Sequence, residues 1–88
     1  MAPPLTPEML VIIETQFFAA DRKAINELLL SYGDEPRHRE VDRIRFGVLE
    51  LSGGDLQKAQ EWMALAKHDY RDLIVSAEYT VLPKGKPQ

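Results

Sequence analysis

Few residues of this chain have side chains that could bind a metal or catalyse a reaction and are also spaced so that they could lie together. The clearest group surrounds His68. Asp72 follows it by four residues and Glu61 precedes it by seven, so one continuous helix would place the three side chains on the same side. Residues four apart on a helix can share a metal ion. All three ligands would come from a single helix, however, and no residue that would orient the histidine is evident. We therefore predict an exposed polar helix face and no metal site.

The pair His68 and Asp72 could also orient an imidazole for acid–base catalysis. No nucleophile accompanies the pair on that face, and the chain contains no cysteine, which excludes thiol catalysis, disulfides and zinc–thiolate sites. An enzyme would require a pocket in which His68 or His38 lies beside a second convergent polar group. We predict no catalytic residue, no cofactor and no enzymatic activity.

A second group is basic and could contact phosphates. It consists of Arg37, Arg39, Arg43 and Arg45, beside His38. Acidic residues interleave with these arginines, and the whole chain has a net charge of −3, so no overall field draws it onto nucleic acid. We favour a solvated helix with local ion pairs. A small nucleic-acid-binding regulator that uses the four arginines is the alternative function.

The longest uninterrupted helical period runs from Asp55 to Tyr79, a stretch that contains neither glycine nor proline. Its apolar positions alternate between spacings of three and four residues, which places them on one stripe of a helix. They are Leu56, Ala59, Met63, Ala66, Tyr70, Leu73 and Ala77. We predict one helix over this whole stretch, with the stripe packed against other helices. Its five acidic side chains against three basic ones make it a poor DNA-recognition helix.

The N-terminal region begins with a specific helix-start pattern, in which Thr6 caps, Pro7 suits the first turn and Glu8 favours the positive end of the helix dipole. A helical stripe follows at Leu10, Ile13, Phe17, Ala20, Ala24 and Leu28. A strand over Val11–Phe18 is the disfavoured alternative, since no hairpin partner is visible. Residues 7–32 form either one helix or two helices that meet near Asp21, and Gly33 ends the region.

A second helix is predicted from Pro36 to Leu51, with its apolar face at Val41, Ile44, Val48 and Leu51. The short break Ser52-Gly53-Gly54 separates it from the long stretch. A short break between two helices favours an antiparallel hairpin. The expected fold is therefore all-α, a small bundle of three to four helices with an antiparallel C-terminal helical hairpin.

The chain of 88 residues is expected to form one domain. We predict a flexible N-terminus at residues 1–5, a single helical domain at 6–80 and a flexible C-terminal tail at 81–88. The apolar run from Met9 to Ile13 is too short for a membrane span, which needs about 20 residues. The N-terminus has no basic region typical of a signal peptide, so we expect a cytoplasmic protein with no membrane contact.

Three stretches of the C-terminal half resemble a known group of sequences. They are Leu51-Ser52-Gly53-Gly54-Asp55-Leu56, Ala66-Lys67-His68-Asp69-Tyr70-Arg71-Asp72-Leu73 and Ala77-Glu78-Tyr79. The pattern is similar to that of small uncharacterised bacterial all-helical proteins. The resemblance implies a helical hairpin and has no assigned activity to transfer.

Apolar residues outside the main stripe point to a partner. Trp62 flanks the stripe, and Leu65, Val75 and Tyr79 lie on a different face of the predicted long helix. A helix that is apolar on two sides is either packed between neighbours or reserved for a partner. The N-terminal helix could cover the second side, and this alternative stays open. The predicted function is a non-catalytic protein–protein interaction module that self-associates as a homodimer through these four residues.

Overall fold

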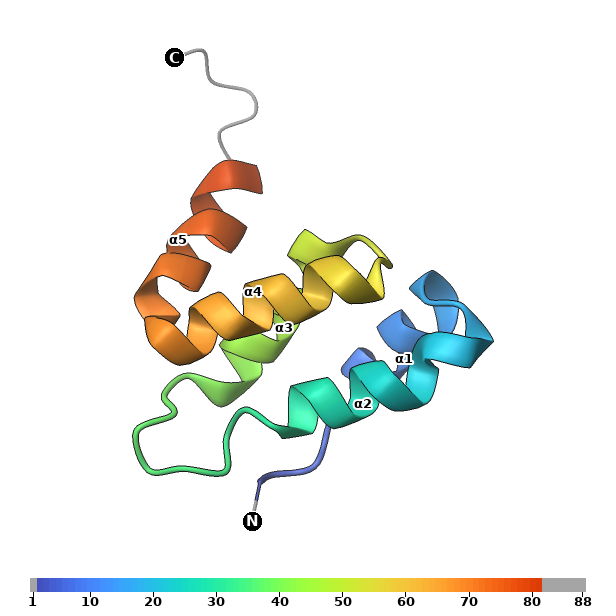
Figure 1. Cartoon of the computed structure of the whole chain (residues 1–88), viewed down its shortest axis with the longest axis horizontal. Helices are drawn as coiled ribbons and strands as arrows, with labels where there is room; N and C mark the ends of the chain where they lie inside the picture. Colours follow the sequence, from blue (N-terminus) through green and yellow to red (C-terminus); the bar gives the residue numbers. More distant parts are fainter. Residues whose placement is uncertain (1, 82–88) are drawn as a thin grey trace.

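The computed structural model describes the backbone of residues 2–81 and the side chains of residues 2–78. This part of the chain contains five α-helices, one short 3₁₀ helix and no strand (Figure 1). The helices are α1 (Pro7–Gln16), α2 (Arg22–Leu30), α3 (Val41–Ser52), α4 (Leu56–His68) and α5 (Tyr70–Val81), with the 3₁₀ helix η1 at Ala19–Asp21. The all-α class is confirmed, and the expected number of three to four helices was too low. The predicted tail at 81–88 lies outside the described residues except for the backbone of Val81.

Helix α1 begins where the sequence pattern placed it. The Thr6 hydroxyl accepts a hydrogen bond from the Met9 N–H at 3.3 Å, and Pro7 occupies the first turn. The helix ends at Phe17, whose backbone is extended with ψ 146°. The strand alternative for this segment was wrong because the capped helix satisfies the first backbone donors locally.

Residues 7–32 form two α-helices, with η1 between them. The extended backbone of Phe17 and Phe18 interrupts the helix, and Asp21 precedes α2 without a side-chain capping bond. The Arg22 guanidinium donates to the Glu14 carbonyl at 3.0 Å, across this break. The last turn of α1 is thereby tied to the first turn of α2.

The second predicted helix starts five residues later than expected, because residues 31–40 form a loop. Glu40 lies immediately before α3 and has a positive φ of 53°. This left-handed backbone conformation costs about 1–2 kcal/mol for a residue with a side chain, and it stops a right-handed helix from extending backwards. The prediction of helix over 36–40 was therefore wrong.

The predicted single helix from Asp55 to Tyr79 is also wrong, because the chain breaks at Asp69. This residue is extended, with φ −155° and ψ 101°, and its carboxylate accepts a hydrogen bond from the Arg71 N–H at 3.1 Å. Asp69 thus ends α4 and caps α5, and α5 turns away from the axis of α4 (Figure 1).

The apolar stripe survives this break. Most of its members are buried on both sides of Asp69, namely Ala59, Met63, Ala66, Leu73 and Ala77. A one-residue extended kink leaves the inward positions of both helices directed at the same core. The burial pattern was therefore predicted correctly although the helix that carries it was not.

Helix α3 packs against α1, α4 and α5, and its residues Ile44, Val48 and Leu49 are fully buried. Gly47 faces α5, where an added Cβ would lie 3.0 Å from the Leu73 side chain. Helices α3 and α4 are consecutive, separated by a three-residue turn and packed together, as the short break indicated. Their antiparallel direction stays a prediction.

Residues 3–5 of the N-terminal segment contact the rest of the fold, and the flexibility predicted for residues 1–5 stays a prediction. Leu5 packs against the core cluster, and the carbonyl oxygen of Pro3 accepts a hydrogen bond from Arg45 of α3 at 3.0 Å. Pro3 also lies close to Gly33, just beyond the end of α2, where an added Cβ would be 3.3 Å from the proline ring. A bond to a residue 42 positions away cannot be read from local sequence.

An ion pair fastens α3 to α5. Arg43 donates two hydrogen bonds to the Glu78 carboxylate, at 2.6 and 2.7 Å. These bonds hold the pKa of Glu78 below its usual value. A carboxylate whose folded pKa is lowered stabilises the fold above its unfolded pKa, and this contribution disappears as the pH falls through the folded value.

We therefore expect the midpoint of thermal unfolding to fall when the pH is lowered from about 6 to about 3. Glu78→Gln should show a smaller fall than the wild type, measured by circular dichroism. The remaining dependence comes partly from Asp69, whose pKa is lowered by its hydrogen bonds with Arg71. Glu27→Gln removes an exposed carboxylate that has no ion pair within the described residues, and it should keep the wild-type dependence. Equal behaviour of the two variants would contradict the assigned role of Glu78.

Candidate functional site

The break at Asp69 separates the four residues of the predicted interface. Trp62 and Leu65 lie on α4, whereas Val75 and Tyr79 lie on α5. Trp62 is half-buried against the core cluster, Leu65 is half-buried, and Val75 is 51% exposed. The side chain of Tyr79 lies outside the described residues. The premise that one helix presents two apolar sides therefore does not hold for this part of the chain.

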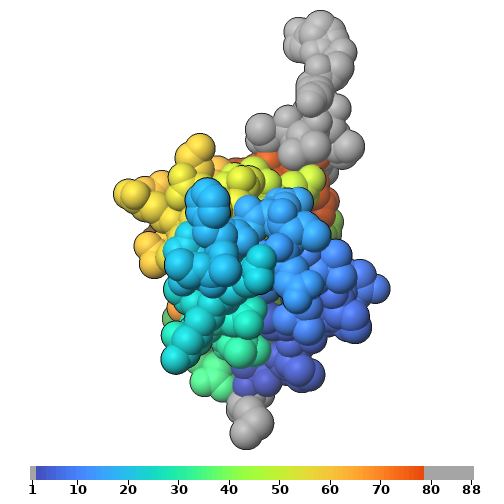
Figure 2. All heavy atoms as spheres, turned by 90° about the vertical axis from the view of Figure 1, so that its right-hand side faces the viewer, coloured from blue at the N-terminus to red at the C-terminus, as the bar shows by residue number. Residues whose placement is uncertain are grey.

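Helix α1 is instead the element with apolar side chains on both sides. Met9 and Ile13 are buried, whereas Leu10 and Val11 are 44% and 58% exposed. Phe18, just beyond the helix, is 79% exposed and is the most exposed large apolar side chain described. The surface of α1, η1 and the start of α2 faces the viewer in Figure 2, in blue to cyan. We call Leu10, Val11 and Phe18 the α1 surface.

The sequence reading placed Leu10 in the core and thereby missed this surface. The consecutive apolar residues from Met9 to Ile13 fit more than one helical stripe, and the structure buries Met9 in place of Leu10. Ala20, also predicted to be inside, is exposed because it lies in η1, where the α-helical period no longer applies. The five-residue apolar run was itself the signal for a two-sided helix.

Arg45 lies inside the protein, where it is fully buried. Its Nε and Nη2 atoms donate to the carbonyl oxygens of Leu29 and Tyr32, each at 2.9 Å. Its Nη1 reaches the N-terminal segment at Pro3 and Pro4. Burial lowers the pKa of the guanidinium, and the nearby carboxylate of Asp42 opposes this effect. Arg45 is therefore a structural residue, and its burial contradicts both the solvated position favoured for it from the sequence and the alternative of a phosphate contact.

The other three arginines have different environments. Arg43 pairs with Glu78 of α5, and the exposed Arg37 pairs through its Nε with Glu35 at 2.7 Å. The side chain of Arg39 is exposed. The four arginines are therefore divided among the core, an inter-helix ion pair and the 31–40 loop. They do not make the continuous basic helix face on which the nucleic-acid alternative depended.

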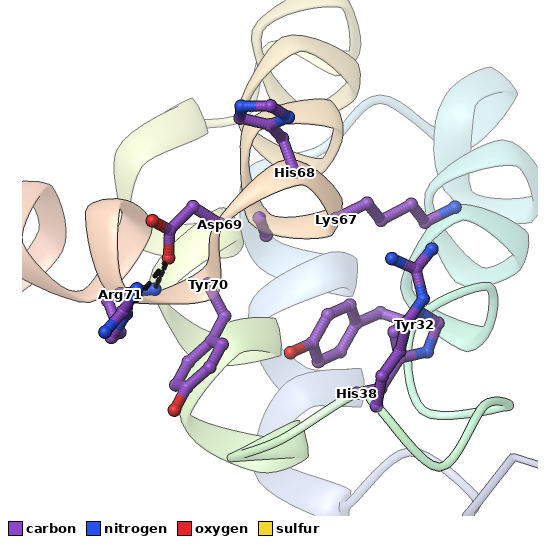
Figure 3. Close-up of a pocket in the computed structure, with 9 residues that line it drawn as sticks. Tyr32, His38, Lys67, His68, Asp69, Tyr70 and Arg71 are labelled. Carbon is purple, nitrogen blue, oxygen red and sulfur yellow. Dashed lines mark hydrogen bonds and ion pairs between the residues drawn. The ribbon is translucent and has the colours of Figure 1, made fainter.

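A hollow of about 270 Å³ lies between the 31–40 loop and the junction of α4 with α5 (Figure 3). We call it the junction hollow. It is lined by Tyr32, Arg37, His38, Ala66, Lys67, His68, Asp69, Tyr70 and Arg71. Three of these side chains are cationic and two are histidines, whereas Asp69 supplies the only carboxylate. That carboxylate pairs with Arg71 at 3.3 Å, and Arg37 pairs with Glu35, so Lys67 is the cation of the hollow that has no ion pair within the described residues.

Hydrogen bonds of the 31–40 loop fix the wall of the junction hollow. The His38 ring stacks on Tyr32 with 4.4 Å between ring centroids, and its Nδ1 accepts from the Gly33 N–H at 2.9 Å. The Tyr32 hydroxyl donates to the Arg39 carbonyl at 2.7 Å and accepts from its N–H at 3.1 Å. Burial is the main reason that the pKa of Tyr32 is raised.

The hydrogen bonds of His38 assign its tautomer. Because Nδ1 accepts, the proton of the neutral ring is on Nε2. This Nε2–H group is buried and has no hydrogen-bond partner among the described residues. An unpaired buried donor of this kind costs about 1–3 kcal/mol, and it is the buried side-chain donor of the hollow wall that lacks an acceptor among the described residues.

His68, Asp72 and Glu61 do not form the metal group that was considered and rejected from the sequence. His68 is the last residue of α4, and Asp72 belongs to α5, so the break removes their common helix face. In the described part of the chain, no group of three histidine, aspartate or glutamate side chains is placed to hold a metal ion.

Comparisons with protein-family models, with curated proteins and with solved structures find no match to this chain. The resemblance of the C-terminal half to small bacterial helical proteins therefore stays an expectation. None of the described helices has both the length and the apolar character needed to cross a bilayer.

Proposed function

We propose that this chain is a non-catalytic protein–protein interaction module that self-associates as a homodimer through the α1 surface. The observation that carries the proposal is the exposure of Phe18, at 79%, beside a helix that already buries Met9 and Ile13 on its inner side. Full burial of a large apolar side chain contributes about 1.5–3 kcal/mol. Scattered apolar side chains are normal on protein surfaces, but three on one short segment favour an interface.

The charges along this segment support a second copy as the partner. The exposed Glu8 precedes the apolar residues in the chain, and the exposed Lys23 follows them. In a two-fold dimer the same surface is used by both copies, so that residue i of one contacts residue j of the other. A two-fold pairing in which the segments run antiparallel would bring Glu8 of each copy toward Lys23 of the other. Such opposite charges at the rim set orientation more than they add affinity.

We expect Val11→Glu and Phe18→Glu to convert the dimer to a monomer, because a carboxylate in an apolar interface must be desolvated without a partner. The measurement is the solution mass by light scattering after size exclusion, across a range of concentrations. Val75→Glu is the matched control, since Val75 is similarly exposed but lies on α5. It should leave the dimer intact.

The outcomes separate two surfaces. Loss of the dimer in Val75→Glu alone would place the interface on α5, as the sequence predicted from Val75 and Tyr79, and would contradict the α1 surface. A strict monomer for the wild type at every concentration would contradict self-association itself. Unchanged circular dichroism in all three variants would show that the substitutions act on assembly and not on folding, as expected for exposed positions.

A further inference from the structure

We propose that the junction hollow binds the phosphate group of a small molecule. This site is independent of the proposed self-association, which uses a different part of the chain. The chain has a net charge of −3, yet Arg37, Lys67 and Arg71 line the hollow. Arg37 pairs with Glu35 and Arg71 with Asp69, so the charge of Lys67 has no ion-pair partner within the described residues. A local cationic concavity on an acidic chain is the electrostatic arrangement that attracts an anion.

Two of the cations have donors available for a ligand. Arg37 uses its Nε for Glu35, and no described residue accepts from its two terminal nitrogens. Lys67 has no ion-pair partner within the described residues. Arginine offers a planar pair of donors and lysine a point charge, which is the combination that commonly holds phosphate oxygens.

The only carboxylate of the hollow is directed away from this pair. Figure 3 shows Asp69 and Arg71 together on one side of the helix junction, while Lys67 extends toward the opposite side, where Tyr32 and His38 lie. Asp69 is also committed to the backbone N–H of Arg71, at the start of α5. An anion beside Lys67 would therefore meet little repulsion from Asp69.

His38 supplies a donor that lacks an acceptor. Its Nε2–H is buried and unpaired, and the ring is held by the stack on Tyr32 and by the Gly33 N–H. A phosphate oxygen would satisfy this group. Because Nε2 is shielded from solvent, the ligand would first contact Arg37 and Lys67, and a bond to Nε2 would require a side chain at the rim to move.

The size of the hollow limits the ligand. Its volume of about 270 Å³ is slightly below the range of about 300–1,000 Å³ that is typical of drug-sized ligands. Tyr70, which is half-buried at the rim, offers an aromatic surface for a small organic group. The site therefore fits a compact phosphate monoester.

The test is a titration of the ¹⁵N-labelled protein with inorganic phosphate, followed by amide NMR shifts, with chloride at matched ionic strength as reference. We expect saturable shifts within residues 33–39 and 66–71, together with a shift of the His38 Nε2 signal. Lys67→Gln should weaken binding by about tenfold or more, since a charge-assisted hydrogen bond is lost. Lys58→Gln removes an exposed lysine of the same helix outside the hollow and should bind as the wild type does.

Three results would overturn the proposal. They are shifts that grow linearly without saturation, an equal loss of binding in Lys67→Gln and Lys58→Gln, and saturable shifts confined to other residues.

A second titration uses adenosine monophosphate and a single-stranded oligonucleotide. Competition of the nucleotide with inorganic phosphate would support the site. Binding of the oligonucleotide alone would overturn it in favour of a nucleic-acid surface. Arg37→Gln, which changes an exposed loop residue, repeats the test if Lys67→Gln lowers the unfolding midpoint.

Discussion

Arg45→Ala is expected to lower the free energy of unfolding by about 3–5 kcal/mol, because it removes hydrogen bonds from a buried charged donor and deletes a large buried side chain. The guanidinium is fully buried and donates to the backbone carbonyls of Leu29 and Tyr32 at the end of α2. These carbonyls lie at the negative end of the helix dipole. The Leu29 carbonyl also accepts from the Tyr32 N–H at 3.2 Å, so the truncation removes one of its donors, whereas the Tyr32 carbonyl loses the guanidinium donor at 2.9 Å. The truncation also opens a cavity between α3, α2 and Pro3.

The measurement is urea unfolding followed by circular dichroism. Arg43→Ala is the matched control, because Arg43 lies two residues away on α3 and its pair with Glu78 is exposed to solvent. An exposed ion pair contributes about 0–1 kcal/mol, so this variant should remain close to the wild type. Arg45→Lys should fall between the two, since an ammonium cannot reproduce the planar set of donors. Similar losses in Arg43→Ala and Arg45→Ala would contradict the structural role of Arg45.

The second large effect is expected at Gly54, in the turn between α3 and α4. Its φ is +90°, and a Cβ added there would collide with the backbone carbonyl oxygen of Gln16, at the end of α1. A residue with a side chain pays about 1–2 kcal/mol for the left-handed region, and steric overlap with rigid backbone adds about 1–3 kcal/mol. Gly54→Ala should therefore destabilise the protein by about 2–5 kcal/mol, as measured by chemical denaturation.

Gly53 provides the control within the same turn. Its φ is +57°, but an added Cβ would meet nothing within 4 Å. Gly53→Ala should therefore lose only the free energy that a residue with a side chain pays for the left-handed backbone conformation, about 1–2 kcal/mol. The difference between the two variants isolates the contact between this turn and α1. If Gly53→Ala and Gly54→Ala lowered the free energy of unfolding equally, the overlap with the Gln16 carbonyl would not contribute to the loss of stability.

The local features of the chain could be predicted from sequence because their causes act within a few residues. Thr6 and Pro7 start α1, and Asp55 caps α4 by accepting from the N–H groups of Gln57 and Lys58. The three- and four-residue spacing of apolar positions in 56–77 predicted which side chains face the core. Capping bonds span two or three residues, and the helical period spans one or two turns.

Other local features fitted two structures equally well, so the sequence alone could not choose between them. Asp69 is a good cap, yet nothing local distinguishes it from an ordinary helical aspartate in a period that continues on both sides. Met9 and Leu10 are both apolar neighbours on α1, and either could have faced inward. The structure buries Met9, and this choice exposes Leu10 and creates the α1 surface. Packing against α3 and α2 decided it.

Arg45 and the junction hollow show what tertiary structure alone decides. From the sequence, Arg45 is one of four similar arginines, and only its position opposite the end of α2 makes it a core residue. Its carbonyl partners lie 13, 16, 41 and 42 residues away. Likewise, Lys67 of α4 lines the same hollow as Arg37 and His38 of the 31–40 loop, although the two segments are far apart in the chain. The energy of such contacts depends on distances through space, and neither composition nor periodicity specifies the distance between residues that are far apart in the chain.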